Sequence, residues 1–84
     1  MKKTIAKKLY IILSKKRNGK YLISLEDHAA ANVFYAELAI SRSYKKAFRF
    51  YKRMKSIKSV RKYAKSSEEK GKIYDIDKKR FIKN

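Results

Sequence analysis

The sequence has no cysteine, no proline and no tryptophan, only two glycines and a single histidine. Without cysteine there is no disulfide, no thiolate nucleophile and no cysteine-ligated metal. Gly19 and Gly71 are isolated, so there is no glycine-rich loop of the kind that cradles phosphates. His28 has no second histidine or marked nucleophile to work with, and the acids are too scattered for a metal site. We therefore expect no enzymatic activity, no metal and no cofactor.

Long apolar runs are also missing. No stretch approaches the roughly 18 apolar residues that a membrane-spanning helix needs. The opening segment superficially resembles a secretory signal, but Lys7 and Lys8 interrupt it and no small-residue cleavage site follows. Binding to a membrane surface is disfavoured as well, because the apolar residues of the basic segment, which include Tyr44, Phe48 and Tyr51 at helical spacing, are needed for the core. We expect a cytoplasmic protein without a membrane partner.

The most informative absence is that of acidic residues. The chain has 25 basic and 7 acidic residues and a formal net charge of +18, and no acid lies between Leu38 and Ser67. A helix that is merely solvated usually mixes signs and pairs Glu with Lys at four-residue spacing. A field of one sign and this size normally has a polyanionic partner. The acid-free interval contains eleven bases: Arg42, Lys45, Lys46, Arg49, Lys52, Arg53, Lys55, Lys58, Arg61, Lys62 and Lys65.

One feature of the fold can be predicted in detail. Asn18-Gly19 lies between two apolar runs, residues 9–14 and 21–25, which is a strong hairpin signal. A two-residue turn would mix apolar and polar side chains on both faces. A three-residue loop over residues 17–19, with Gly19 in a left-handed conformation, gathers the apolar side chains on one face. We therefore predict these pairs: Leu13 with Ile23, Ile11 with Leu25, and Lys15 with Tyr21.

The remaining elements follow from caps and periodicity. Residues 24–27 have the form of a capping box and predict a helix from Leu25 or Glu26 to Ile40. A second helix is predicted from Tyr44 to about Lys65, and a third strand over residues 72–76. The expected fold class is α+β: a small antiparallel sheet, made of the hairpin and a C-terminal strand, packed by two helices in the order ββααβ. Residues 1–84 would form one basic nucleic-acid-binding domain with flexible ends at 1–6 and 78–84.

Bases interleaved with aromatic residues suit nucleic acid, because phosphates attract the charge and bases stack on the rings. The second helix lacks Asn and Gln, and the chain carries no RNA-recognition-motif signature or KH loop, so we expect binding that is largely independent of sequence. The aromatic content favours RNA over DNA. The candidate phosphate contacts on the helix are Lys45, Lys46, Arg49, Lys52, Arg53, Lys55, Lys58, Arg61 and Lys62, and those on the hairpin loop are Lys15, Lys16, Arg17 and Lys20.

Four tyrosines are candidate stacking platforms: Tyr10, Tyr21, Tyr35 and Tyr63. Exposed tyrosines could equally serve a protein interface, whereas we assign Phe34, Phe48 and Tyr51 to the core. Two alternatives to RNA binding remain: a protein-directed inhibitor that uses its basic face on an acidic partner, and a DNA-binding architectural protein. The sequence leaves open whether the chain forms a homodimer and whether the hairpin loop and the basic helix share one face.

The lysine-heavy composition without cysteine or proline, the opening segment Met1–Leu13 and the basic central helix together resemble the phage-encoded TifA proteins. The resemblance implies a counter-defence factor that binds RNA together with the type III toxin–antitoxin endoribonuclease ToxN and holds the toxin inactive on RNA. The protein would then act in the cytoplasm of the host cell. The lysine-rich helix would be its RNA surface, and no residue is assigned to the toxin contact.

Overall fold

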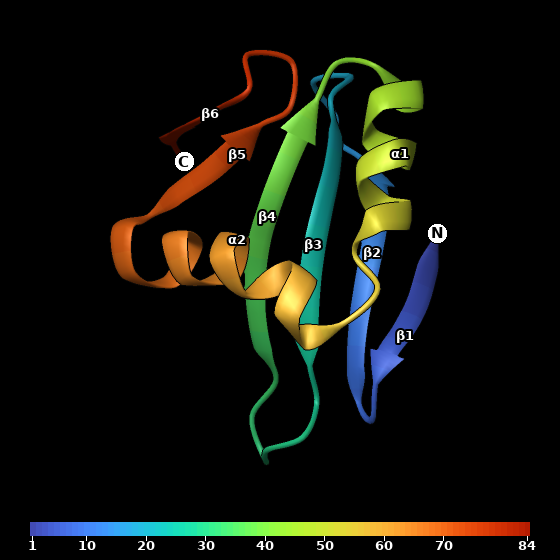
Figure 1. The fold of residues 1–84 in the computed structure, drawn as a ribbon, viewed down its shortest axis with the longest axis vertical. Coiled ribbons are helices and arrows are strands. Elements are labelled where there is room, and N and C mark those ends of the chain that lie inside the picture. Colours follow the sequence, from blue (N-terminus) through green and yellow to red (C-terminus); the bar gives the residue numbers. More distant parts are fainter.

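The computed structural model describes residues 1–84 and has an α+β fold, as predicted (Figure 1). Two helices cover one face of a six-stranded mixed sheet whose strand order is β1-β2-β3-β4-β5-β6. The prediction of a three-stranded antiparallel sheet in the order ββααβ is wrong, because the chain forms six strands and β5 runs parallel to β4. The elements are β1 (Lys2–Ala6), β2 (Leu9–Lys15), β3 (Tyr21–Asp27), β4 (Phe34–Ser41), α1 (Tyr44–Arg53), α2 (Ile57–Lys70), β5 (Lys72–Asp75) and β6 (Arg80–Lys83).

The β2–β3 hairpin has the predicted register. Leu13 lies opposite Ile23, and Lys15 lies opposite Tyr21. Gly19 closes the loop with a φ of 83°, in the left-handed region that glycine adopts without strain. The turn residues and the alternation of apolar residues favour the same register, so residues close together in the sequence were sufficient to predict this hairpin.

The predicted helix over residues 25–40 is wrong. β3 continues through Asp27, and β4 returns antiparallel to it. Ser24, the expected helix cap, is buried within β3, and the Asp27 side chain instead accepts a hydrogen bond of 2.9 Å from the backbone N–H of Ala29 in the turn that follows. A helix would have left the edge of β3 that β4 now covers without a pairing partner, whereas additional strands stabilise a hairpin.

The basic segment also differs from the prediction of one helix ending near Lys65. α1 ends at Arg53, where the N–H of Met54 donates to the carbonyl of Tyr51 at 3.2 Å. α2 begins after Ser56, whose hydroxyl accepts from the N–H of Ser59 at 3.3 Å while the Ser59 hydroxyl accepts from the N–H of Ser56 at 3.0 Å. This reciprocal capping box satisfies two backbone donors and starts the second helix in a new direction.

The two ends of the chain, expected to be flexible, lie in edge strands. β1 pairs with β2, and β6 pairs with β5. Lys3 also donates a hydrogen bond of 2.6 Å to the carbonyl of Tyr51, near the end of α1. Burial and the nearby charge of Lys55 lower the pKa of the Lys3 ammonium. The third strand predicted at residues 72–76 is present as β5, but it pairs with β4 and β6 rather than with the hairpin.

The core lies between the sheet and the helices. Phe50 is fully buried there, with its ring centroid 4.9 Å from that of Tyr63. Of the aromatics assigned to the core, Tyr51 is buried, Phe48 is half-buried and Phe34 is 37% exposed. Strand alternation places a second, smaller cluster on the opposite face of the sheet. It consists of Leu22, Ile40, Ile73 and the half-buried Ile82.

Candidate nucleic-acid interface

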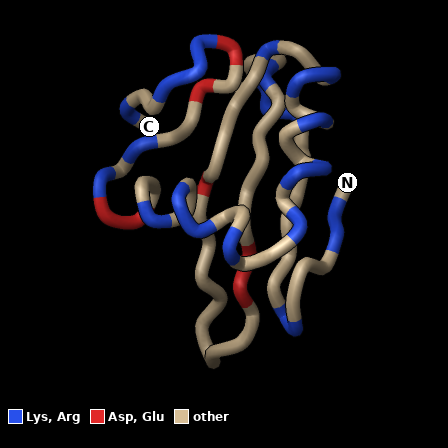
Figure 2. Tube along the Cα trace, viewed as in Figure 1, with Lys and Arg blue, Asp and Glu red and all other residues tan.

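The basic residues are spread over both helices, the β2–β3 loop and both edges of the sheet, whereas the few acids gather in small groups (Figure 2). None of the lysine or arginine side chains forms an ion pair with a carboxylate. The one close contact between a carboxylate and a side chain that can carry a positive charge is the hydrogen bond of 3.0 Å between His28 Nε2 and Glu26 Oε1. The positive field is therefore not cancelled locally and is available to an external anion.

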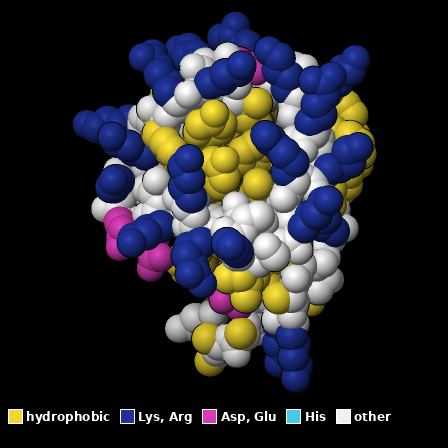
Figure 3. All heavy atoms as spheres, viewed as in Figure 1, with side chains coloured by type: hydrophobic (Ala, Val, Ile, Leu, Met, Phe, Trp, Pro, Cys, Tyr) yellow, Lys and Arg dark blue, Asp and Glu magenta, His cyan; other side chains and the backbone are white.

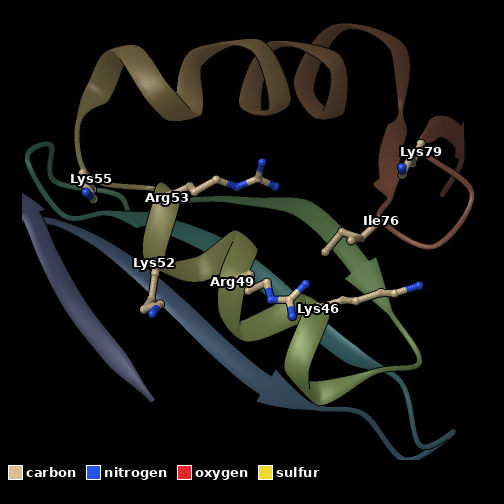
Figure 4. Close-up of a pocket in the computed structure, with 7 residues that line it drawn as sticks. All are labelled: Lys46, Arg49, Lys52, Arg53, Lys55, Ile76 and Lys79. Carbon is tan, nitrogen blue, oxygen red and sulfur yellow. The ribbon is translucent and has the colours of Figure 1, made fainter.

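On the helical face, lysine and arginine side chains surround a hydrophobic patch that is framed by α1, α2 and β5 (Figure 3). Beside this patch is a hollow of about 670 Å³, which we call the cationic basin (Figure 4). No acid lines it, and its one apolar lining residue is Ile76. Its cations are Lys46, Arg49, Lys52, Arg53, Lys55 and Lys79.

α1 supplies most of these cations because of its periodicity. Lys46, Arg49 and Arg53 recur at three- and four-residue spacing and share one side of the helix. The adjoining side, which includes Ala47 and Phe50, is buried against the sheet. Packing of the apolar side thus fixes the direction in which the bases project. The bases of the last turn, such as Arg53, also interact favourably with the negative end of the helix dipole.

The β5–β6 turn completes the basin. Asp77 accepts hydrogen bonds from the hydroxyl of Ser41 at 2.6 Å and from the backbone N–H of Arg42 at 2.9 Å. These two donors, the Arg42 amide and then the Ser41 hydroxyl, lower the pKa of the Asp77 carboxyl. The N–H of Ile76 donates to the carbonyl of Ile40 at 2.9 Å. These bonds attach the turn to the β4–α1 corner and hold Lys79 at the rim of the basin.

Five of the nine predicted helix bases line the basin, namely Lys46, Arg49, Lys52, Arg53 and Lys55. The other four lie outside it: Lys45 on α1, and Lys58, Arg61 and Lys62 on α2. Lys62 Nζ lies 5.8 Å from the ring centroid of Tyr63 and 6.0 Å from that of Phe81. Arg61 lines a separate groove.

The loop bases Lys15, Lys16, Arg17 and Lys20 lie in and beside the β2–β3 turn. That end of the hairpin touches the start of α1, because the ring centroids of Tyr21 and Tyr44 are 5.4 Å apart. The loop and the basic helix therefore adjoin, which the sequence had left open.

The sequence missed two basin residues, Ile76 and Lys79. The feature of the sequence that could have indicated the turn carrying them is Asp75. Its carboxylate accepts from the N–H of Asp77 at 3.0 Å and from the N–H of Lys78 at 3.1 Å. An Asp that caps its own turn in this way predicts a tight turn. It does not predict that the turn lies beside α1, because the parallel pairing of β4 with β5 decides that placement.

The four stacking candidates differ in their surroundings. Tyr63 is half-buried against Phe50, and burial raises the pKa of its hydroxyl. Tyr10 is half-buried and meets His28 edge-on at 5.3 Å, and Tyr21 is half-buried. Tyr35 is 51% exposed, and alternation with the buried Ala36 places it on the face away from the helices. None of the four lines the basin.

No family model, curated protein or solved structure matches this chain. Neither of its helices is both long and apolar enough to cross a membrane.

Proposed function

We propose that this protein binds RNA through the cationic basin, with the adjoining hairpin loop extending the contact. The observation that carries the proposal is that six cations surround one hollow in which no carboxylate lies. A phosphate backbone placed there would release its condensed counterions, and that release supplies the binding free energy. The proposed RNA contacts are Lys46, Arg49, Lys52, Arg53, Lys55 and Lys79 in the basin, and Lys15, Lys16, Arg17 and Lys20 in the hairpin loop.

The proposed binding is largely independent of sequence. The basin offers lysine and arginine but neither asparagine nor glutamine, the side chains that most often read adenine edges. Contacts to phosphates position a protein on nucleic acid without reading bases. The preference for single-stranded RNA over duplex DNA rests on the aromatic side chains near the basic surface, because the bases of a single strand can stack on these rings and paired bases cannot.

The test is a triple charge reversal, Arg49→Glu with Lys52→Glu and Arg53→Glu. The matched control reverses three bases that do not line the basin, Lys7, Lys70 and Lys83. Each set changes the net charge by −6, from +18 to +12. We expect the basin variant to lose RNA binding in mobility-shift titrations and the control to retain most of it, with unchanged circular dichroism for both. Equal losses would mean that only total charge matters, and an unchanged affinity would remove the basin from the mechanism.

Competition decides between the proposed ligands. Single-stranded RNA should displace bound RNA more effectively than duplex DNA of equal length. The opposite order would favour a DNA-binding architectural protein. Failure of both polynucleotides to bind, with capture of an acidic protein after nuclease treatment, would favour the protein-directed inhibitor.

A second function rests on the TifA resemblance and on a different groove. On the other side of α2 from the basin lies a hollow of about 410 Å³ that is lined by six apolar residues, three acids and the two bases Arg61 and Lys65. Ile57 is 50% exposed and Phe34 is 37% exposed in its wall. Its acids are Asp27, Glu68 and Glu69, so nearly half of the seven acids in the chain adjoin this groove. We propose that a toxin endoribonuclease docks here while RNA occupies the basin.

A double variant tests this second function. Ile57→Ser with Phe34→Ser should retain RNA affinity and lose the ability to inhibit the endoribonuclease in an RNA-cleavage assay. Undiminished inhibition would contradict the assignment of the groove. A second copy of the chain could also occupy this groove and form a homodimer. Sedimentation equilibrium of the free protein tests this, because such a dimer would dissociate in the same double variant.

A further inference from the structure

A series of aromatic rings lies along α1, separate from the basin. The ring centroids of Tyr44 and Phe48 are 5.9 Å apart with planes inclined at 14°, and those of Phe48 and Tyr51 are 6.3 Å apart at 20°. The spacing of four and then three residues puts these side chains on one side of the helix. Three nearly parallel rings are thus held in order by the helix backbone.

The series runs from the core to the surface. Tyr51 is buried, Phe48 is half-buried, and Tyr44 at the N-terminal end of the helix is 47% exposed. Phe48 stacks on one side of Tyr44, and Tyr21 meets it at an interplanar angle of 68°. Tyr44 is therefore held in place by two ring contacts while nearly half of its surface stays accessible. A ring that is both fixed and exposed can accept a stacking partner without a large loss of side-chain entropy.

Cations adjoin this series on two sides. Lys52 Nζ lies 5.3 Å from the ring centroid of Phe48, and Lys15 Nζ lies 5.9 Å from that of Tyr21. Lys52 belongs to the basin, and Lys15 belongs to the hairpin loop. A base stacked at Tyr44 would therefore have cations near the phosphates on both sides of its nucleotide. Aromatic platforms flanked by basic grooves are the usual means of binding single strands.

We propose that Tyr44 is the stacking platform for an unpaired nucleobase, so that the ligand is single-stranded RNA running from the hairpin loop past Tyr44 toward the basin. This inference rests on the proposed RNA binding and narrows it to a strand class and a residue. Tyr44 was not among the tyrosines that the sequence suggested for stacking. A paired base in an A-form duplex has both faces occupied by its neighbours, and hence cannot stack on this ring.

Substitution at Tyr44 tests the inference. Tyr44→Ala should weaken binding of a 12-nucleotide oligouridine by roughly tenfold, since stacking of one base contributes about that much. Tyr44→Phe keeps the ring and should bind as the wild type does. The matched control is Tyr35→Ala, which removes another exposed tyrosine on the opposite face of the sheet. Affinity for an RNA duplex should be the same in all four proteins.

Photo-crosslinking locates the contact directly. Oligouridine that carries 5-iodouridine should crosslink to Tyr44 on irradiation, as identified by mass spectrometry of the digested protein. If the wild type binds RNA and Tyr44→Ala binds it with the same affinity, the inference is overturned while RNA binding itself stands. A crosslink that maps to another residue would have the same consequence. If the wild-type protein binds no RNA at all, the proposed function fails and this inference fails with it. Circular dichroism of Tyr44→Ala excludes unfolding as the cause of a loss.

Discussion

Asp77 accepts a hydrogen bond of 2.6 Å from the hydroxyl of Ser41, a residue 36 positions earlier in the chain. The same carboxylate accepts from the N–H of Arg42 at 2.9 Å, and the Ser41 hydroxyl accepts from the N–H of Ser43 at 3.0 Å. Ser43 caps α1. One carboxylate thus joins the β5–β6 turn to the segment that begins the basic helix, and the two sides of the cationic basin keep a fixed separation.

Replacing Asp77 tests this connection. Asp77→Asn removes the charge and one of the two acceptor oxygens, so we expect a loss of about 1 kcal/mol in the free energy of unfolding, a figure reduced because the side chain is exposed. Urea denaturation of both proteins at neutral pH measures this difference in unfolding free energy. Loss of the connection should also lower RNA affinity, because Lys79 would no longer be held opposite α1.

The pH dependence of the unfolding free energy is the matching control for Asp77→Asn. Because the pKa of Asp77 is lower in the folded protein than its usual value, the carboxylate stabilises the fold above that usual value, and the contribution is lost as the pH falls through the folded-state pKa. The difference between the wild type and Asp77→Asn should therefore be largest above about pH 4 and shrink below it. A difference that stays constant down to pH 2 would show that Asp77 does not act through its charge.

The break between the two helices depends on the Ser56 cap. Ser56→Ala removes the acceptor for the N–H of Ser59, and we expect a loss of about 1 kcal/mol in unfolding free energy. Ser56→Asp keeps an acceptor at the cap and adds a negative charge at the positive end of α2, so it should be at least as stable as the wild type. Thermal unfolding followed by circular dichroism compares the two. Equal melting temperatures would show that the cap is not what starts α2.

Phe50 tests the packing that orients α1. Its side chain is fully buried, and its removal in Phe50→Ala should cost about 3–5 kcal/mol. A domain of this size has little more stability than that, so we expect the variant to be unfolded at 25 °C. Phe48→Ala removes the same ring from a half-buried position and should stay folded. A folded Phe50→Ala protein with an intact near-ultraviolet spectrum would contradict the described core.

The sequence predicted best those features of the fold that depend on residues close together in the chain. The Asn18-Gly19 hairpin was predicted with its register, because turn chemistry and strand alternation lie within a few residues of each other. The segment that became β4 was predicted as a helix, because its alanines and apolar residues also fit helical spacing and Ser24 resembled a cap. The pairing of β3 with β4 outweighed that local preference.

The candidate site was predicted in part for the same reason. The bases of α1 follow from periodicity, so Arg49 and Arg53 could be assigned to one surface in advance. Lys79 could not, because its position beside α1 follows from a parallel strand pairing and from the contact between Asp77 and Ser41. Tyr44, Phe48 and Tyr51 recur at four- and three-residue spacing, which predicts one apolar side of a helix, and only the packed structure leaves Tyr44 47% exposed.

The salt dependence of the RNA association constant tests binding in the cationic basin most directly. With one phosphate at each of the six basin cations, the logarithm of the association constant for single-stranded RNA should fall against the logarithm of salt concentration with a slope of roughly −4, and contacts of the hairpin loop would make the slope steeper. Replacing Arg49, Lys52 and Arg53 by glutamine should reduce the magnitude of that slope by about 2, at about 0.7 for each lost phosphate contact. A wild-type slope near zero, or the same slope in both proteins, would contradict the claim that the cationic basin binds the RNA backbone.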